Sequence, residues 1–188
     1  MRLDPGWQRQ RQVDQYLTDA ADATAAATFG RRYVFGTIRR EEVNVSTRVD
    51  WTFTPRLSLQ LFAQPFAATG RYVGFASFAR PRAFEFTPLP AVRDGGRVTV
   101  DADAAGPSPA ITFDEPDFAV RSLRGNAVAR WEYRPGSALF VVWQQQREVD
   151  RDAALGPLSS GERPRVERVF GDPGTHVLLV KVSHWLGR

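Results

Sequence analysis

Few side chains in this sequence are suited to catalysis or metal binding. The only two histidines are His176 and His184, and the chain has no cysteine. Both histidines fall in the segment expected to form the last strand, eight residues apart. At about 3.3 Å per residue they lie roughly 26 Å apart, which is too far to share one metal ion. Thiolate catalysis and cysteine-bound metals are excluded.

Five acidic side chains lie close together in a stretch rich in proline and glycine. They are Asp101, Asp103, Asp114, Glu115 and Asp117. Closely spaced carboxylates can bind Ca²⁺, but the twelve-residue calcium-loop pattern is absent. We interpret this stretch as a solvated loop. No serine or histidine has a recognisable catalytic partner either, so the sequence predicts no catalytic residues, no cofactor, no metal and no enzyme.

The net charge of +4 comes from arginines that are scattered among acids rather than clustered, and Lys181 is the only lysine. Nucleic-acid binding requires clustered basic side chains, so a nucleic-acid partner is not predicted. No apolar run reaches the roughly 20 residues of a membrane helix. The chain does not start with a secretory signal, and we expect it to be the C-terminal part of a longer precursor.

Apolar and polar side chains alternate strictly from residue 42 to residue 54. The apolar set is Val43, Val45, Thr47, Val49, Trp51 and Phe53. A period of two predicts a β-strand with one apolar face and one wet face. Residues 54–56 form a tight turn around Pro55, and a second strand follows.

The same plan recurs 80 positions later. Trp131 corresponds to Trp51 and Pro135 to Pro55, and the turn at residues 134–137 contains a Pro-Gly pair suited to a type II turn. The connections between the hairpins are much longer, at about residues 19–32, 69–116 and 150–172. Short turns on one side and long loops on the other are typical of outer-membrane β-barrels.

Two sets of residues follow from the barrel interpretation. The polar side chains expected to face the lumen are Arg48, Asp50, Gln60, Asn126, Arg130 and Glu132. The aromatic side chains expected at the membrane interface, next to the short turns, are Trp51, Phe53, Trp131 and Tyr133. The charged members of the first set are candidates for ion pairs across neighbouring strands.

A soluble β-sandwich that binds a glycan through its loops is the alternative. The two hypotheses differ over the apolar face, because side chains such as Val45, Val49, Leu59 and Ala129 would contact lipid in a barrel. In a sandwich they would be buried against a second layer of the same molecule.

Several blocks of the sequence also resemble a known family. They include Thr47-Arg48-Val49-Asp50-Trp51-Thr52-Phe53-Thr54-Pro55, Trp131-Glu132-Tyr133-Arg134-Pro135-Gly136-Ser137 and Leu179-Val180-Lys181-Val182-Ser183-His184-Trp185-Leu186. From about residue 16 onward the chain resembles the C-terminal part of a bacterial domain-of-unknown-function family. Its members carry an N-terminal carbohydrate-binding-like module of the family 9 type, followed by a large outer-membrane β-barrel.

The resemblance implies that residues 1–188 are a single barrel segment in the outer membrane of a Gram-negative cell. The expected fold is all-β, an antiparallel meander of about six long strands that forms part of a transmembrane barrel. The implied partners are outer-membrane lipid, the missing N-terminal part of the same protein and a saccharide. One departure is the ending at Gly187-Arg188, since many such barrels end on an aromatic residue.

Overall fold

The computed structural model describes residues 1–151 and 163–186. Six long antiparallel strands form the main sheet, which confirms the prediction of an all-β antiparallel fold. These strands are β1 (Arg2–Ala21), β2 (Arg31–Thr54), β3 (Leu57–Phe78), β8 (Phe118–Arg134), β9 (Ser137–Arg151) and β10 (Gly174–Ser183). Part of the connection expected at about 150–172 lies outside the described residues.

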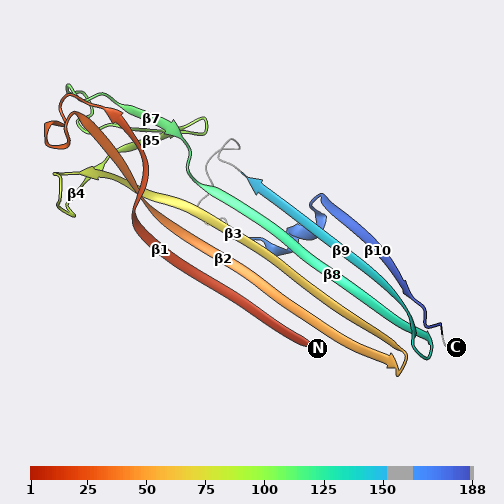
Figure 1. Cartoon of the computed structure of the whole chain (residues 1–188). Helices are drawn as coiled ribbons and strands as arrows, with labels where there is room; N and C mark the ends of the chain where they lie inside the picture. The colour runs from red at the N-terminus through yellow and green to blue at the C-terminus, as the bar shows by residue number, and fades with distance from the viewer. Residues whose placement is uncertain (152–162, 187–188) are drawn as a thin grey trace.

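The long strands follow one another across the sheet in the order β1-β2-β3-β8-β9-β10. They run side by side as an elongated ribbon, and both chain ends lie at the end that carries the short turns (Figure 1). Within the described residues β1 and β10 do not pair with each other. The sheet is therefore open, and the chain does not form a closed barrel.

Each of the two short hairpin turns has a proline at its second position, as the sequence predicts. Pro55 and Arg56 join β2 to β3, while Pro135 and Gly136 join β8 to β9. Gly136 has a φ of 77°, and a type II turn requires such a positive φ at its third position, which glycine adopts at least cost.

The connection predicted from residue 69 starts later, and this prediction was wrong. β3 continues to Phe78 and also pairs with the short strand β4 (Phe86–Leu89). Gly70 pairs with residues on both neighbouring strands. The ring of Phe118 lies over Gly70, so cross-strand pairing outweighs the weak strand propensity of glycine.

The remaining connection contains a small three-stranded sheet. Its strands are β5 (Ala91–Asp94), β6 (Arg97–Val100) and β7 (Ile111–Asp114). β6 lies in the middle and pairs antiparallel with both of its neighbours. Figure 1 shows this small sheet at the end of the molecule opposite the short turns.

The main hydrophobic core lies between the small sheet and the far end of the long sheet. Val34 and Phe75 of the long sheet pack with Val98, Val100 and Ile111 of the small sheet. The rings of Phe75 and Phe113 meet edge to face at 5.7 Å. Other buried hydrophobic side chains among the described residues lie along the long strands, among them Ala67, Ala68 and Leu123.

Within residues 1–151 and 163–186, helical structure is limited to short 3-10 turns, η1 (Ala26–Thr28) and η3 (Val166–Gly171). In the part of the chain that the structure describes, no helix is long and apolar enough to cross a membrane.

Candidate functional site: the two faces of the long sheet

The six polar residues predicted to face a lumen all lie on one face of the long sheet, which we call the polar face. Residues directly opposite each other on neighbouring strands share a face. Asp50 is opposite Gln60, and Arg48 is opposite Phe62, which in turn is opposite Asn126. The even-numbered side chains of β2 and β8, and those of β3 up to Tyr72, therefore form one continuous surface. Beyond a bulge in the pairing, Phe75 and Ser77 of β3 continue it.

Four of the six predicted polar residues line a hollow of about 400 Å³ on this face. They are Arg48, Asp50, Gln60 and Asn126. Arg130 and Glu132 form an ion pair of 3.1 Å, but both belong to β8. The expectation of ion pairs across neighbouring strands is therefore wrong for this pair, because side chains two residues apart on a strand share a face and reach each other directly.

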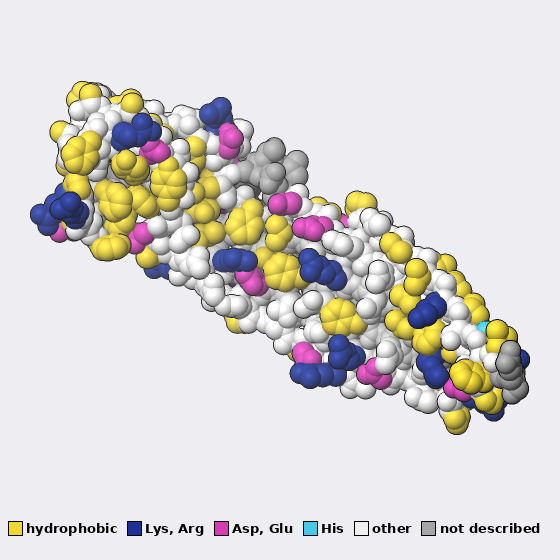
Figure 2. Space-filling view, in the orientation of Figure 1, with side chains coloured by type: hydrophobic (Ala, Val, Ile, Leu, Met, Phe, Trp, Pro, Cys, Tyr) yellow, Lys and Arg dark blue, Asp and Glu magenta, His cyan; other side chains and the backbone are white. Residues whose placement is uncertain are grey.

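A larger hollow of about 850 Å³ lies next to it, between β8, β9 and β10, and the sequence reasoning did not single it out. Its polar lining includes Arg124, Asn126, Gln144, Gln146 and Glu148. The alternation of β9 could have indicated these glutamines. Figure 2 shows basic and acidic side chains next to one another at several points along the visible face.

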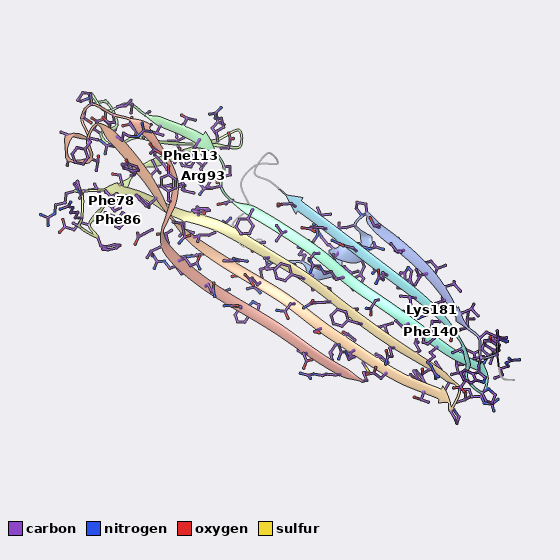
Figure 3. All side chains as sticks on the ribbon, viewed as in Figure 1. Phe78, Phe86, Arg93, Phe113, Phe140 and Lys181 are labelled. Atoms are coloured by element: carbon purple, nitrogen blue, oxygen red, sulfur yellow. The ribbon has the colours of Figure 1, made fainter. Side chains whose placement is uncertain are left out.

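The polar face continues to the last strand, which adds a lysine to it. Arg130 on β8 is opposite Phe140 on β9, which is opposite Lys181 on β10. Figure 3 shows Phe140 and Lys181 side by side near the short turns.

The opposite, apolar face carries a band of aliphatic side chains that no second layer covers. We define the apolar band as Val43, Val45, Val49, Leu57, Leu59, Leu61, Ala63, Ala127, Ala129, Leu139, Val141, Leu178, Val180 and Val182. None of these residues is buried. The band spans β2, β3, β8, β9 and β10, because its members face one another in register.

The four predicted interface aromatics lie on this apolar face, at the edge next to the short turns. Trp51 is 58% exposed and Trp131 is 51% exposed. The ring of Trp51 stacks on Phe53 at 5.1 Å, and Trp131 meets Tyr133 at 6.1 Å. Large aromatic rings that remain exposed in pairs are unusual on a surface that meets only water.

The C-terminal tail folds against the short turn between β8 and β9. Arg134 donates to the carbonyl of Trp185 at 2.8 Å, and the Trp185 amide donates to the Ser137 hydroxyl at 2.9 Å. Tyr133 hydrogen-bonds His184 at 2.7 Å. His184 therefore lies just beyond the last strand, whereas His176 stacks on Trp143. The described residues contain no group of three or more potential metal ligands.

Residues 163–172, which include η3, lie on the apolar face, beyond the end of the band that is farther from the short turns. Arg121 binds the Asp172 carboxylate through two hydrogen bonds, of 3.0 and 2.9 Å. Arg147 donates to the carbonyls of Phe170 and Asp172 at 2.6 Å each. Val169 is fully buried, where η3 contacts β3 and β8. Sequence reasoning did not identify this segment.

The acidic stretch is only in part the solvated loop that the sequence predicted, since Asp103 and Asp114 are exposed but two other acids are not. Glu115 and Asp117 are buried, and Arg93 forms ion pairs with both. Arg93 also donates to the Tyr72 carbonyl and lies over the ring of Phe75 at 5.5 Å. Glu115 and Asp117 are buried because they attach the small sheet to the long sheet. The spacing of residues in the sequence alone cannot indicate such a contact.

A second buried carboxylate, Asp22, joins two of the connections at the same end. It accepts hydrogen bonds from Thr24, Arg32 and Ser108. Burial by itself raises the pKa of Asp22, but these donors outweigh it and hold the pKa well below its ordinary value of 3.8. Asp22 is therefore charged at neutral pH and links the β1–β2 connection to the β6–β7 connection.

Comparison of the chain with protein-family models, with curated proteins and with solved structures finds no match. The function therefore has to be argued from the two faces of the long sheet.

Proposed function

We propose that the chain is a non-enzymatic segment of an outer-membrane β-barrel. The apolar band contacts lipid, and the polar face forms part of the wall of an aqueous interior. The family resemblance described above, which stays a prediction, points the same way.

The uncovered apolar band is the observation that supports this proposal best. On β2 the apolar alternation runs from residue 43 to residue 53. Ten steps of about 3.3 Å give roughly 33 Å, or roughly 24 Å in height for a strand tilted by about 45°, close to the apolar band of about 25 Å in outer-membrane barrels. A sheet that meets water on both faces has no reason to display such a band.

The open edges of the sheet suit a segment of a larger barrel. In hydrocarbon every backbone N–H and C=O must be hydrogen-bonded, so only closed sheets cross a membrane. β1 and β10 each have one free edge within the described residues. We infer that strands from the N-terminal part of the same protein, which precede this chain, pair with these edges.

The small sheet lies over the polar face, because its core partners Val34 and Phe75 belong to that face. Inside a closed barrel this position would narrow the mouth of the interior at the long-loop end. The proposed interior is rich in neutral amides, among them Gln60, Asn126, Gln144 and Gln146. Amides both donate and accept hydrogen bonds, which suits a saccharide as the solute that binds or passes.

The soluble sandwich remains the alternative, favoured by the two-layer packing of the small sheet on the long sheet. That packing covers only one end. Val45, Val49, Leu59 and Ala129, which a sandwich would bury, are all partly exposed.

The absence of cysteine allows a clean test with two adjacent labelled positions. Val49→Cys places bimane on the apolar band, and Asp50→Cys places it on the polar face as a matched control. In vesicles with lipids brominated at mid-chain, we expect strong quenching at position 49 and weak quenching at position 50. Equal quenching at both positions, or a monodisperse monomer without detergent, would contradict the proposal.

A further inference from the structure

A basic hollow lies beside the apolar band, on the same face of the sheet. Four arginines line it, namely Arg121 of β8 and Arg163, Arg165 and Arg168 of the segment that contains η3. No acidic side chain is among the lining residues, and the floor is formed by small residues of β3 and β8 such as Ala67 and Ala119. The hollow has a volume of only about 20 Å³, so it cannot enclose a phosphate group. Arg163, Arg165 and Arg168 around it are exposed, and their guanidinium groups can bind an anionic group at the surface.

The balance of charge in this region favours the same kind of ligand. Arg121 is paired with Asp172, but Arg163, Arg165 and Arg168 form no ion pair with any residue that the structure describes. Arg147 also holds the segment. Among the described residues of this region, five arginines therefore lie near two acids, Glu167 and Asp172, which gives these residues a charge of 5 − 2 = +3.

The hollow belongs to a wider basic border along the apolar band. On each of β1, β2, β3, β8 and β9, an arginine of the apolar face lies two or four residues from an apolar side chain of that face, on the side toward the long connections. These residues are Arg9, Arg39, Arg71, Arg121 and Arg147. Three of them lie beside acids, namely Arg9 beside Glu41, Arg71 beside Asp117 and Arg121 beside Asp172. The border lies toward the long connections, opposite the edge that carries Trp51 and Trp131.

The exposed side chain of Phe170 adds an apolar contact at the same place. Val169 points into the protein and is fully buried, whereas its neighbour Phe170 is 59% exposed. Arginines with an exposed aromatic side chain among them are the combination that segments at a membrane surface use, because the ring enters the acyl region and the cations stay at the head groups.

We propose that the basic hollow binds the phosphate groups of a membrane lipid whose acyl chains lie along the apolar band. Resting on the proposed membrane function, this inference assigns a partner to residues that the barrel wall itself does not require. Guanidinium groups bind phosphate oxygens through paired hydrogen bonds. The hollow is continuous with the apolar band, which favours a lipid head group over a free anion. Since the long connections of such barrels face outward, the lipid is the phosphorylated glycolipid of the outer leaflet.

The first test needs no variant. The full chain in a neutral detergent is titrated with lipid A that carries two phosphates, and separately with the same lipid after removal of both phosphates. Native mass spectrometry measures the fraction of protein with bound lipid. We expect the phosphorylated form to bind about tenfold or more tightly, since each arginine near an anionic surface contributes about 1 kcal/mol and 1.4 kcal/mol corresponds to tenfold. Equal binding would overturn the proposal.

The second test locates the site. The triple variant Arg163→Gln, Arg165→Gln, Arg168→Gln removes three charges from the hollow and leaves the Arg121–Asp172 pair in place. The control triple Arg2→Gln, Arg48→Gln, Arg124→Gln removes three charges from the polar face. We expect the first variant to lose about tenfold to 100-fold in lipid A affinity and the control to change little. Equal losses would mean a general charge effect and would refute the site.

The third test distinguishes a lipid from a soluble anion with the same chemistry. Pyrophosphate at millimolar concentration is added to the wild-type complex, and we expect most of the lipid to remain bound because its acyl chains contribute. Complete displacement would assign the hollow to a soluble phosphate and reject the lipid. If lipid A shows no phosphate preference while bimane at position 49 is quenched, the head-group site fails and the membrane-spanning proposal stands.

Discussion

The polar face brings together side chains whose positions follow from the alternation of polar and apolar residues along each strand. Arg48, Asp50, Gln60 and Asn126 share a hollow because they are even-numbered residues of strands that pair in register. Arg93 could not have been linked to Glu115 from the sequence, since the two meet only when the small sheet packs on the long sheet. Period-two patterns specify a face, but they do not specify which loop side chain covers it.

Asp22 gives a prediction at the same scale. Asp22→Asn keeps the shape of the side chain but leaves Arg32 without its partner and directs an amide N–H₂ toward other donors. We expect a loss of about 1–3 kcal/mol in the free energy of unfolding at neutral pH, from urea unfolding in detergent. Asp19→Asn, which breaks a more exposed pair with Arg31, is the control and should cost less.

The pKa of Asp22 makes this difference depend on pH. Because folding lowers this pKa, the charged carboxylate stabilises the fold above its ordinary pKa of 3.8, and this contribution is lost as the pH falls below that value. The gap in unfolding midpoint between wild type and Asp22→Asn should therefore narrow between about pH 5 and pH 3. A gap that stays constant over this range would show that the charge is not the cause.

At the scale of elements, the hairpins were predictable and the connection between them was not. Strict alternation and the prolines of the short turns placed the short-turn ends of β2, β3, β8 and β9 correctly. The glycines and prolines of residues 69–116 indicate a loop. Gly70 nevertheless stays in β3, since it pairs with Arg40 and Phe118 on its two neighbours. Such pairing partners are distant in sequence and leave no local signal.

The attachment of the small sheet can be tested through Arg93. Arg93→Met leaves Glu115 and Asp117 buried without this cation, with Arg71 still 4.0 Å from Asp117. Removing one partner of a buried ion pair lowers the free energy of unfolding by about 3–5 kcal/mol. Because the contact to Arg71 remains, we expect a loss of about 3 kcal/mol. We expect faster amide hydrogen exchange in β6 and unchanged exchange in β8 and β9.

Two further variants complete this experiment. Arg80→Met removes an exposed arginine paired with Glu85 and should leave exchange in β6 unchanged. Adding Glu115→Gln and Asp117→Asn to Arg93→Met removes the uncompensated charges and should restore part of the protection. If β6 exchanges as slowly in Arg93→Met as in wild type, the ion pairs do not hold the small sheet.

At the scale of the whole molecule, the open sheet predicts the behaviour of the isolated chain. The outer edges of β1 and β10 present unpaired backbone groups beside an exposed apolar band, and such edges pair with other chains. Without detergent we expect large assemblies by size-exclusion chromatography with light scattering, and in detergent smaller, defined particles. The last strand could be predicted from the sequence, but the lack of a partner for each edge is visible only in the assembled sheet.

The meander has a consequence for the order in which the chain can fold. Every neighbouring pair in the long sheet is also adjacent in sequence except β3 and β8, which are separated by residues 79–117. Closing a loop costs entropy that rises with the logarithm of its length. Because β5, β6 and β7 pair only with one another, the intervening stretch can contract by itself before the hairpins meet. The small sheet thus reduces the effective length of the loop between β3 and β8. The largest non-local step in folding is then the docking of the strands before this loop on the strands after it.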